Sequence, residues 1–404
     1  MSNILFDFIQ IAIGNRKSLS ATINDSDWLR LFEFCKSQYI VGIGYTAVEK
    51  LHNQELICPS SLEEQWRALV HKMEKQNEVI NKACADISKQ YKHDGFFTCI
   101  LHSQGSLLNY PEELRMRRMP GNIDVWASPL CDISVAVQTG SNDVEYATYN
   151  GFRAVREYVK MQHRIDGYFE KPVVRYHHIE APKIDGTEVE VHFRPCYAHS
   201  PLRNWRMQRW FNDHADICMK NKTHMGFAVP TASVNVVYQM CHLFSHYFDE
   251  GLGLRQLMDY YFALRVWHND VMECKDLQSQ GMWSEGLGTA VMSKEEVMAV
   301  IRSFGMKKFA SAVMYVLHEV FAIPTNYYIC EPNEKEGRRL LEEIMKGGNF
   351  GQYDERGKEF KNGGMVKHGV CKLKRVMRLV RSYPEEALWE PVFRVYHLFW
   401  RITH

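Results

Sequence analysis

The spacing of apolar residues changes twice along this 404-residue chain, and these changes limit the folds open to it. Residues 27–93 repeat apolar side chains every three or four positions, which predicts helices, the longest from Ser61 to about His93. Between Phe96 and Arg194, short β-prone segments are bounded by glycine and turn residues, which predicts strands. Helical spacing returns from Pro201 onward. The predicted fold class is therefore α+β, with a small mixed domain between helical segments.

We divide the chain into three predicted parts: residues 1–95 are a helical region, 96–200 an α+β core and 201–404 a second helical region. Within the core, residues 143–162 are predicted to be helical. The predicted strands are Phe96–Leu101, Gly121–Ala127, Pro172–Glu180 and Thr187–Arg194.

Composition argues against several classes of protein. The chain has 49 basic and 48 acidic residues, a formal net charge of +1, which gives no bulk attraction to nucleic acid or to a membrane surface. No apolar run approaches membrane-spanning length, and the N-terminal residues lack the basic leader and cleavage site of a signal peptide. The 11 cysteines include no C-x-x-C pair, as expected for reduced thiols. We therefore expect a cytoplasmic protein.

Acidic residues in two of the predicted strands are the strongest candidates for chemistry. Side chains alternate between the faces of a strand, so Asn122 and Asp124 share one face, and Glu188, Glu190 and His192 share a face of the later strand. If the two strands are neighbours, Asp124 and Glu190 converge. Converging carboxylates are suitable ligands for a hard cation such as Mg²⁺.

A Gly-Ser pair precedes these strands. Gly105 and Ser106 close the first strand and open a helix, where free backbone N–H groups can hold a phosphate. Taken alone, this pair is more simply a turn. The order of strand, Gly-Ser turn, helix and acid-bearing strand gives the pair its functional interpretation.

In these features the chain resembles the polymerase-β-like nucleotidyltransferase superfamily and, within it, a bacterial family of uncharacterised nucleotidyltransferases. The resemblance covers most of the chain. The matching segments are Gly105-Ser106-Leu107-Leu108 with Tyr110-Pro111, Arg118, Gly121 to Val125, Val189 to Arg194, the helical positions His242, His246, Gly253 to Arg255 and Asp259, and Gly348 to Gly351 with Tyr353-Asp354.

The resemblance implies a small mixed-sheet core and transfer of a nucleoside monophosphate from a nucleoside triphosphate to an unknown acceptor. It assigns Asp124 and Glu190 as catalytic residues. Asn122 joins these two as a ligand of Mg²⁺ or Mn²⁺. The residues implied to bind the phosphates are Gly105, Ser106, Arg118 and Arg255, with Arg115 and Arg117 as further positive charges.

The chain departs from the family pattern at Asn122, where an acid is expected two residues before Asp124. Asparagine offers one neutral carbonyl oxygen, so the site has two carboxylates in place of three. His102-Ser103-Gln104 also stands where relatives usually have a lysine. Three hypotheses remain open: a nucleotidyltransferase, a degenerate relative that binds a nucleotide or a protein without turnover, and a helical interaction scaffold.

Some residues have a simpler structural explanation. His242 and His246 are one helical turn apart, a spacing that can bind zinc, but no third ligand follows and packing is favoured. Arg255 and Asp259 are spaced for a local ion pair. The basic segment from Lys367 to Arg381 is spaced like the solvated face of a helix, with contact to RNA as the alternative.

Overall fold

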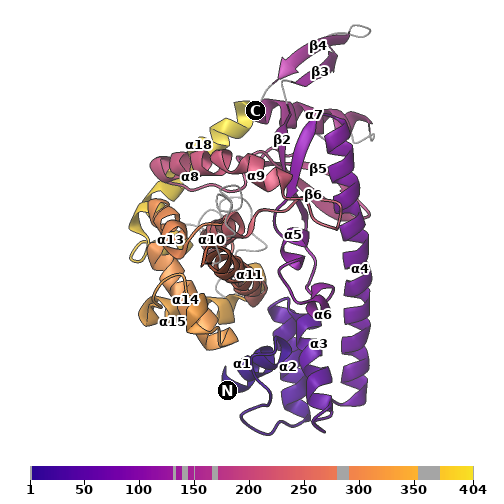
Figure 1. The fold of residues 1–404 in the computed structure, drawn as a ribbon, viewed down its shortest axis with the longest axis vertical. Coiled ribbons are helices and arrows are strands. Elements are labelled where there is room, and N and C mark those ends of the chain that lie inside the picture. The colour runs from indigo at the N-terminus through magenta and orange to yellow at the C-terminus, as the bar shows by residue number, and fades with distance from the viewer. Residues whose placement is uncertain are drawn as a thin grey trace.

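A computed structural model describes residues 2–130, 133–138, 144–149, 151–165, 172–279, 291–353 and 374–403. Helices predominate, and the first four form the N-terminal region (Figure 1). They are α1 (Ser2–Ala12), α2 (Asp25–Ser37), α3 (Val41–His52) and α4 (Ser60–His93). The 34 residues of α4 make a rod of about 51 Å, which runs along one edge of the molecule from the N-terminal helices to the sheet.

The sheet that organises the middle of the chain has four strands in the order β1-β2-β6-β5. These strands are β1 (Phe96–Ile100), β2 (Ile123–Pro129), β5 (His178–Ile184) and β6 (Thr187–His192). β2 and β6 are parallel, whereas the β1–β2 and β5–β6 pairs are antiparallel. The short helices α5 (Gln104–Leu107) and α6 (Glu112–Arg115) connect β1 to β2. The structure confirms the predicted α+β class with a small mixed sheet.

The prediction of one helix over residues 143–162 was wrong for its first part. A separate two-stranded sheet, β3 (Ile133–Gln138) and β4 (Val144–Tyr149), precedes helix α7 (Gly151–Ile165). Gly151 has a φ of +53°, a conformation that glycine adopts without strain, and it marks the change from strand to helix. The alternation of β-branched residues in Ile133–Val137 is the sequence signal that was overlooked.

The predicted strand Pro172–Glu180 is a tight reversal followed by the start of β5. Val174 and Ile179 form an isolated antiparallel bridge, and the Arg175 amide donates to the His178 carbonyl at 2.8 Å. This geometry makes Tyr176 and His177 the two residues of a turn. No glycine, asparagine or aspartate lies between Val173 and Ile179 to indicate such a turn, and here the reversal brings two histidines to the sheet.

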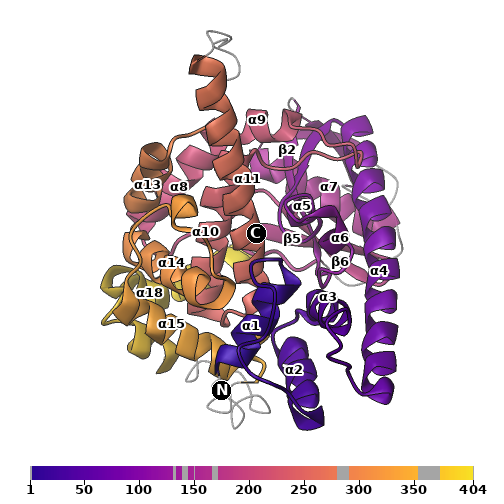
Figure 2. The same ribbon diagram turned by 60° about the horizontal axis from the view of Figure 1, so that its bottom comes forward.

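The remaining helices form the C-terminal region. α10 and α11 lie beside the sheet, and the helices after α11 stack outward from them (Figure 2). They are α8 (Pro201–Asp213), α9 (Ala215–Lys220), α10 (Ala232–Asp249), α11 (Leu254–Ser279), α13 (Lys294–Ser303), α14 (Lys307–Phe321), α15 (Glu334–Gly347) and α18 (Pro384–Thr403), with short 3₁₀ turns η1 (Thr325–Tyr327) and η2 (Asn349–Gly351). The basic segment predicted from Lys367 lies partly outside the described residues.

Two apolar clusters make the core, and they contain residues from opposite faces of the sheet. The smaller cluster lies between the sheet, α4 and α7, and contains Ile123, Val125, Val189 and Val191. Because strand side chains alternate, the residues between these point to the opposite face. The larger cluster joins the N-terminal helices to α10, α11 and α14, so both predicted helical regions share it. The three-part division of the chain stays a prediction.

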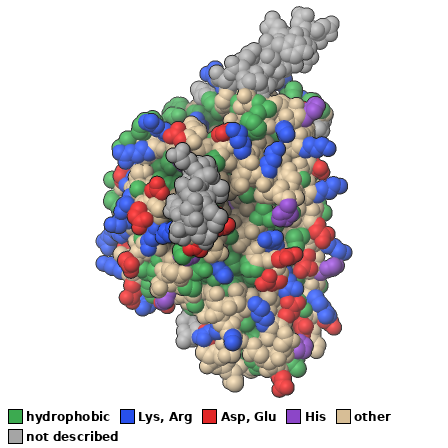
Figure 3. Space-filling view, in the orientation of Figure 1, with side chains coloured by type: hydrophobic (Ala, Val, Ile, Leu, Met, Phe, Trp, Pro, Cys, Tyr) green, Lys and Arg blue, Asp and Glu red, His purple; other side chains and the backbone are tan. Residues whose placement is uncertain are grey.

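Among the described residues, the face of the molecule in Figure 3 carries no single dominant charge. Basic and acidic side chains are interspersed over the face shown in Figure 3, as the net charge of +1 leads one to expect. Among the described helices, none combines the length and apolar character needed to cross a lipid bilayer.

Candidate functional site

The face of the sheet opposite the smaller apolar cluster borders a cavity of about 460 Å³. Its walls come from β2, β5 and β6 on one side and from α10, α11 and η2 on the other. Asp124, Glu190 and His192 line it, together with Arg255 and Phe350. Residues far apart in sequence therefore meet at one concave surface, the usual location of a small-molecule site.

Asp124 and Glu190 are direct neighbours across the parallel β2–β6 pair. This register meets the condition on which the convergence of the two acids depended, namely that their strands are neighbours. Asn122 lies two residues before Asp124, and its side-chain amide donates to Glu190 Oε1 at 3.0 Å. Glu188 does not line the cavity. Its exposed carboxylate forms an ion pair with Lys183 at 3.1 Å. The cavity thus receives two carboxylates and one amide from these strands.

Two histidines complete this cluster. His192 Nε2 lies 3.3 Å from Asp124 Oδ1 and 3.6 Å from Glu190 Oε2, and His178 Nδ1 lies 3.3 Å from Glu190 Oε2. His178 pairs with His192 across the β5–β6 ladder, so three adjacent strands present the four groups on one face. His192 follows Glu190 on the same face, as predicted, whereas His178 was missed because the turn before it was not recognised.

The pKa values in this cluster are set by burial and by mutual contacts. Burial lowers the pKa of His192, but hydrogen bonds to Asp124 and Glu190 outweigh it and raise the pKa to about 9. Burial raises the pKa of Glu190, yet contacts with His192, His178 and Asn122 bring it to about 2. Burial and the neighbouring His192 lower the pKa of His178 to about 3. At neutral pH the cluster therefore holds an imidazolium, an ionised glutamate and a neutral imidazole.

Gly105 and Ser106 lie in α5 and do not line this cavity. A Cβ on Gly105 would lie 2.3 Å from the Ile100 carbonyl oxygen, so this close approach of α5 to β1 requires glycine. The Ser106 side chain is fully buried and accepts a hydrogen bond from Gln239 at 3.4 Å. The backbone amides of both residues donate to carbonyls within the turn. Ser103, rather than this pair, lines the cavity, and its φ is +54°.

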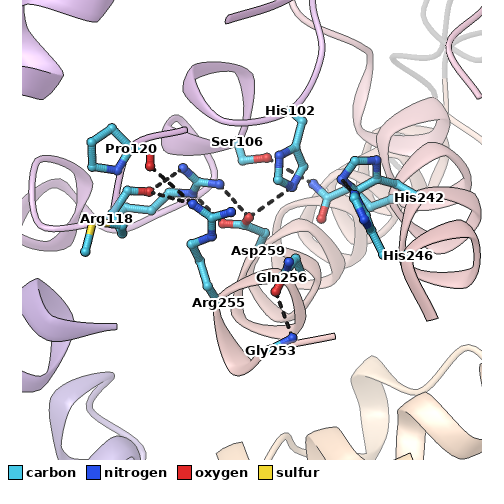
Figure 4. Close-up of polar contacts among 12 residues, drawn as sticks. His102, Ser106, Arg118, Pro120, His242, His246, Gly253, Arg255, Gln256 and Asp259 are labelled. Atoms are coloured by element: carbon cyan, nitrogen blue, oxygen red, sulfur yellow. Dashed lines mark hydrogen bonds and ion pairs between the residues drawn. The ribbon is translucent and has the colours of Figure 1, made fainter. Parts of the chain in front are cut away.

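Arg118 lies behind the cavity wall in a buried ion pair. Its guanidinium donates to both carboxylate oxygens of Asp259, at 2.6 and 2.7 Å, and both side chains are at most 1% exposed. Tyr110 donates to this carboxylate at 2.6 Å. His102 also contacts it, at 3.3 Å (Figure 4). The Asp259 carboxylate thus pairs with Arg118, 141 residues away, and not with Arg255 one helical turn before it.

Arg255 lines the cavity and is 5% exposed. Its Nη1 donates to the Pro120 carbonyl at 3.2 Å, and its guanidinium lies over the rings of Tyr39 and Phe350 (Figure 4 shows the Pro120 contact). Its Nε has no hydrogen-bond partner, and no carboxylate of the described residues forms an ion pair with it. Burial and the nearby Arg118 charge lower the pKa of Arg255 to about 10. It remains a buried cation beside a cavity, suited to an anionic ligand.

His242 and His246 contact each other, with their Nε2 atoms 3.1 Å apart. His242 stacks on His102 with ring centroids 4.3 Å apart, and His246 lies 3.4 Å from Glu250. Burial and the neighbouring His102 hold the pKa of His242 well below its ordinary value. Both rings line the cavity wall and pack against other side chains (Figure 4), in agreement with the packing explanation.

A divalent cation fits the donor atoms of the sheet. One ligand atom each from Asp124, Glu190 and His192 lies within 4.8 Å of the others, and a second such group combines His192 with His177 and His178. Carboxylate oxygens and imidazole nitrogens are both common metal ligands. The fold and this site together define an α+β protein with a candidate cation centre and a buried arginine in one cavity.

Comparison with known proteins agrees with this class. Residues 24–281, well over half of the chain, match the model of a family described as uncharacterised nucleotidyltransferases. The chain belongs to this family. Searches of curated proteins and of solved structures gave no match. The matched range includes the whole four-stranded sheet, α10 and α11, and therefore most of the residues around the cavity.

Proposed function

We propose that this protein transfers a nucleotidyl group from a nucleoside triphosphate to an acceptor, with the help of a divalent cation. One observation carries the proposal: Asp124 and Glu190 stand in register on neighbouring strands and face a cavity that also contains Arg255. Family membership supplies the reaction class, and the cavity supplies a cation centre and an anion-binding group on opposite walls. We assign catalysis to Asp124 and Glu190 within this proposal.

Each residue has a distinct task in such a reaction. Arg255 binds the triphosphate, because its charge faces the cavity without a carboxylate partner. Asp124 and Glu190 hold the cation, and the pKa of Glu190, about 2, makes it a ligand rather than a proton acceptor. A divalent cation held by these residues would neutralise charge on the phosphoryl oxygens. The hydroxyl oxygen of the acceptor bonds to the α-phosphorus and releases its proton to solvent, while the bond from the α-phosphorus to the β-phosphate oxygen breaks and pyrophosphate leaves.

The phosphate contacts in this proposal differ in emphasis from those expected from the resemblance. Arg255 has an accessible position on the cavity wall, whereas Arg118 is bound to Asp259. The amides of Gly105 and Ser106 already donate within their own turn. We therefore propose Arg255 as the main phosphate ligand, with Gly105, Ser106 and Arg118 shaping the wall behind it.

The direct test is to incubate the purified full-length protein with each of the four nucleoside triphosphates, with Mg²⁺, with Mn²⁺ and with neither. Binding that depends on the cation, followed by release of pyrophosphate, is the expected result. A protein that neither binds a triphosphate nor releases pyrophosphate under any of these conditions would contradict the proposal. Calorimetry gives the binding and a coupled phosphate assay gives the turnover.

A second candidate is a relative that binds a nucleotide without turnover. The observation that favours it is Asn122, which supplies an amide N–H to Glu190 Oε1 in place of a third carboxylate. A unit charge about 4 Å from a cation contributes roughly 4 kcal/mol at an effective dielectric of about 20, so its loss weakens cation binding. Triphosphate binding without pyrophosphate release is the result that selects this candidate.

Replacing Asn122 by aspartate is expected to raise the affinity for a divalent cation by at least about tenfold, because it restores a carboxylate beside Glu190. Calorimetric titration with Mn²⁺ measures the change. The matched control is Asn53→Asp, which adds the same charge at an exposed position at the end of α3. Equal Mn²⁺ affinities in the Asn122 variant and the unmodified protein would count against Asn122 as a neighbour of the cation.

A further inference from the structure

A second and larger cavity adjoins the candidate site. Its volume is about 720 Å³, which is within the range of small-molecule sites, and its walls include parts of β2, α8 and α18. Aromatic rings from all three elements line it, among them Trp126 on β2, Trp205 on α8 and Tyr396 on α18. Trp205 and Tyr396 are 58% and 51% exposed. Large apolar rings that remain in contact with solvent around a cavity indicate a binding surface.

The strands that carry the candidate site continue into this aromatic cavity. Trp126 follows Asp124 by two residues and shares its face of β2, and Arg194 follows Glu190 by four residues. Four residues of extended chain span about 13 Å. A third cavity, of about 360 Å³, shares Glu190 with the candidate site and Tyr176 with the aromatic cavity. The three cavities therefore follow one another along the sheet, and one molecule of about this length can extend from the first to the last.

Arg194 provides a positive charge in the aromatic cavity. The central carbon of its guanidinium lies 4.4 Å from the centre of the Tyr176 ring, 5.3 Å from that of Phe193 and 5.7 Å from that of Phe152. Its Nη1 donates to the Tyr176 backbone carbonyl, and it forms no ion pair with a carboxylate in the described part of the chain. Aromatic rings surround this cation, while its N–H groups lie in its own plane. An arginine stacked in this way can bind an anionic group through its edge.

The other polar groups of the cavity have partners within the protein. Burial lowers the pKa of His199, but contact with Glu386 at 3.1 Å outweighs it and raises this pKa, so the charge of His199 is compensated. Gln208 Nε2 donates to Asn204 Oδ1 at 3.1 Å, and Asn204 Nδ2 donates to the Tyr176 hydroxyl at 2.7 Å. These amides are therefore engaged and offer little to a sugar. Among the described residues, no aspartate or glutamate lines the cavity, which disfavours a cationic ligand.

From these observations we propose that the aromatic cavity binds the acceptor of the transferred nucleotidyl group, and that this acceptor is a hydroxylated aromatic compound whose anionic group pairs with Arg194. The inference rests on the proposed function for the ligand's role as acceptor. The aromatic body stacks among the rings, and the hydroxyl extends along the sheet toward Asp124 and Glu190. Its oxygen bonds to the α-phosphorus and its proton passes to solvent, while the bond to the β-phosphate oxygen breaks and pyrophosphate leaves.

The test compares three probes that share one ring system and differ in charge. At neutral pH, 6-hydroxy-2-naphthoate is an anion, 2-naphthol is neutral and 2-naphthylmethylamine is a cation. Calorimetry measures their binding to the full-length protein. We expect one naphthoate per chain, bound at least about tenfold more tightly than naphthol, and the amine bound more weakly than naphthol, because only the anion forms a charge-assisted hydrogen bond with arginine. Equal affinities for the three probes, or no binding of the naphthoate, would overturn the proposal.

Two substitutions separate the contribution of charge from that of stacking. Arg194→Gln is expected to weaken naphthoate binding by about tenfold or more and to leave naphthol within about threefold, so that naphthol binding shows the cavity to be intact. Trp205→Ala should weaken both probes by about fivefold, because it removes an exposed ring of the rim. Leu29→Ala is the matched control, since it shortens an exposed apolar side chain on α2, outside the cavity, and should change neither affinity. Naphthoate binding that is unchanged in Arg194→Gln would refute Arg194 as the anion ligand.

A measurement on the unmodified protein locates the ligand. Crystals soaked in 6-bromo-2-naphthoate should show an anomalous bromine peak among Trp126, Arg194 and Trp205, which line the cavity. A peak only elsewhere would refute the site.

Pyrophosphate release tests the role of the ligand and separates the two proposals. With a triphosphate and a divalent cation, 6-hydroxy-2-naphthoate should raise the rate of release, whereas 2-naphthoate, which lacks the hydroxyl, should not. Equal effects of these two compounds would refute the role as acceptor. Release by a protein that does not bind the naphthoate refutes only the acceptor site, and naphthoate binding at Arg194 in a protein that binds no triphosphate refutes only the proposed function.

Discussion

An Asp124→Asn variant is expected to lose about a thousandfold in the rate of pyrophosphate release. Asp124 is the carboxylate of β2 that faces the cavity, and its Oδ1 contacts His192 at 3.3 Å. Removal of one unit charge about 4 Å from a cation costs roughly 4 kcal/mol at an effective dielectric of about 20. If that loss falls on the transition state, it corresponds to about three factors of ten in rate.

The comparison that isolates this effect is Glu188→Gln on the neighbouring strand β6. Glu188 is exposed, pairs with Lys183 and lies away from the cavity, so its neutralisation should leave the rate within about twofold, as expected for a weak surface ion pair. Thermal unfolding of both variants checks that the fold is kept. An Asp124→Asn protein that folds and works within tenfold of the unmodified rate would rule out Asp124 as the principal cation ligand.

Replacing Asp259 by asparagine is expected to destabilise the protein by about 3–5 kcal/mol, because it leaves the Arg118 guanidinium buried without a counter-charge. Tyr110 loses its charged acceptor at the same time. The shift of the urea unfolding midpoint measures the change. The matched control is Glu334→Gln, which breaks a 2.8 Å ion pair between two exposed side chains, Glu334 and Arg338, and is expected to shift the midpoint far less.

The ion pair between Asp259 and Arg118 also predicts that the stability of the folded protein depends on pH. Burial alone would raise the pKa of Asp259, but the Arg118 guanidinium outweighs it and holds this pKa well below its ordinary value. A lowered pKa in the folded state contributes stability above the ordinary value of about 3.9, and that contribution declines as the pH falls below it. The stability difference between the unmodified protein and Asp259→Asn should therefore narrow below about pH 4. A constant difference down to pH 2 would argue against an ionised Asp259.

Much of the helical framework was predictable from local pattern. The long helix predicted from Ser61 to about His93 is α4, Ser60–His93, and Gly95 after it has a φ of +92°. Pro59 is the N-cap residue of this helix, and no side chain caps it. Apolar periodicity fixes the position of a long helix better than its first residue, since several ends satisfy the same burial.

The candidate site was only partly predictable. The two-residue period of strands predicted which side chains share a face of their own strand: Asn122 with Asp124, and Glu190 with His192. These assignments follow from local geometry alone. His178 was not predicted, because a two-residue turn at Tyr176 and His177 reverses the chain just before it. A His-His pair beside a strand-forming segment was the available signal.

What the sequence by itself determined was which residues share a face of each strand and helix, because that depends on backbone periods of 2.0 and 3.6 residues. Only the tertiary structure decided which faces meet. In the structure, β2 and β6 are parallel neighbours, so Asp124 lies beside Glu190. Asp259 forms an ion pair with Arg118, and Arg255 therefore faces the cavity without this carboxylate as its partner. Such pairings depend on how distant segments pack in one core, and no local pattern contains that information.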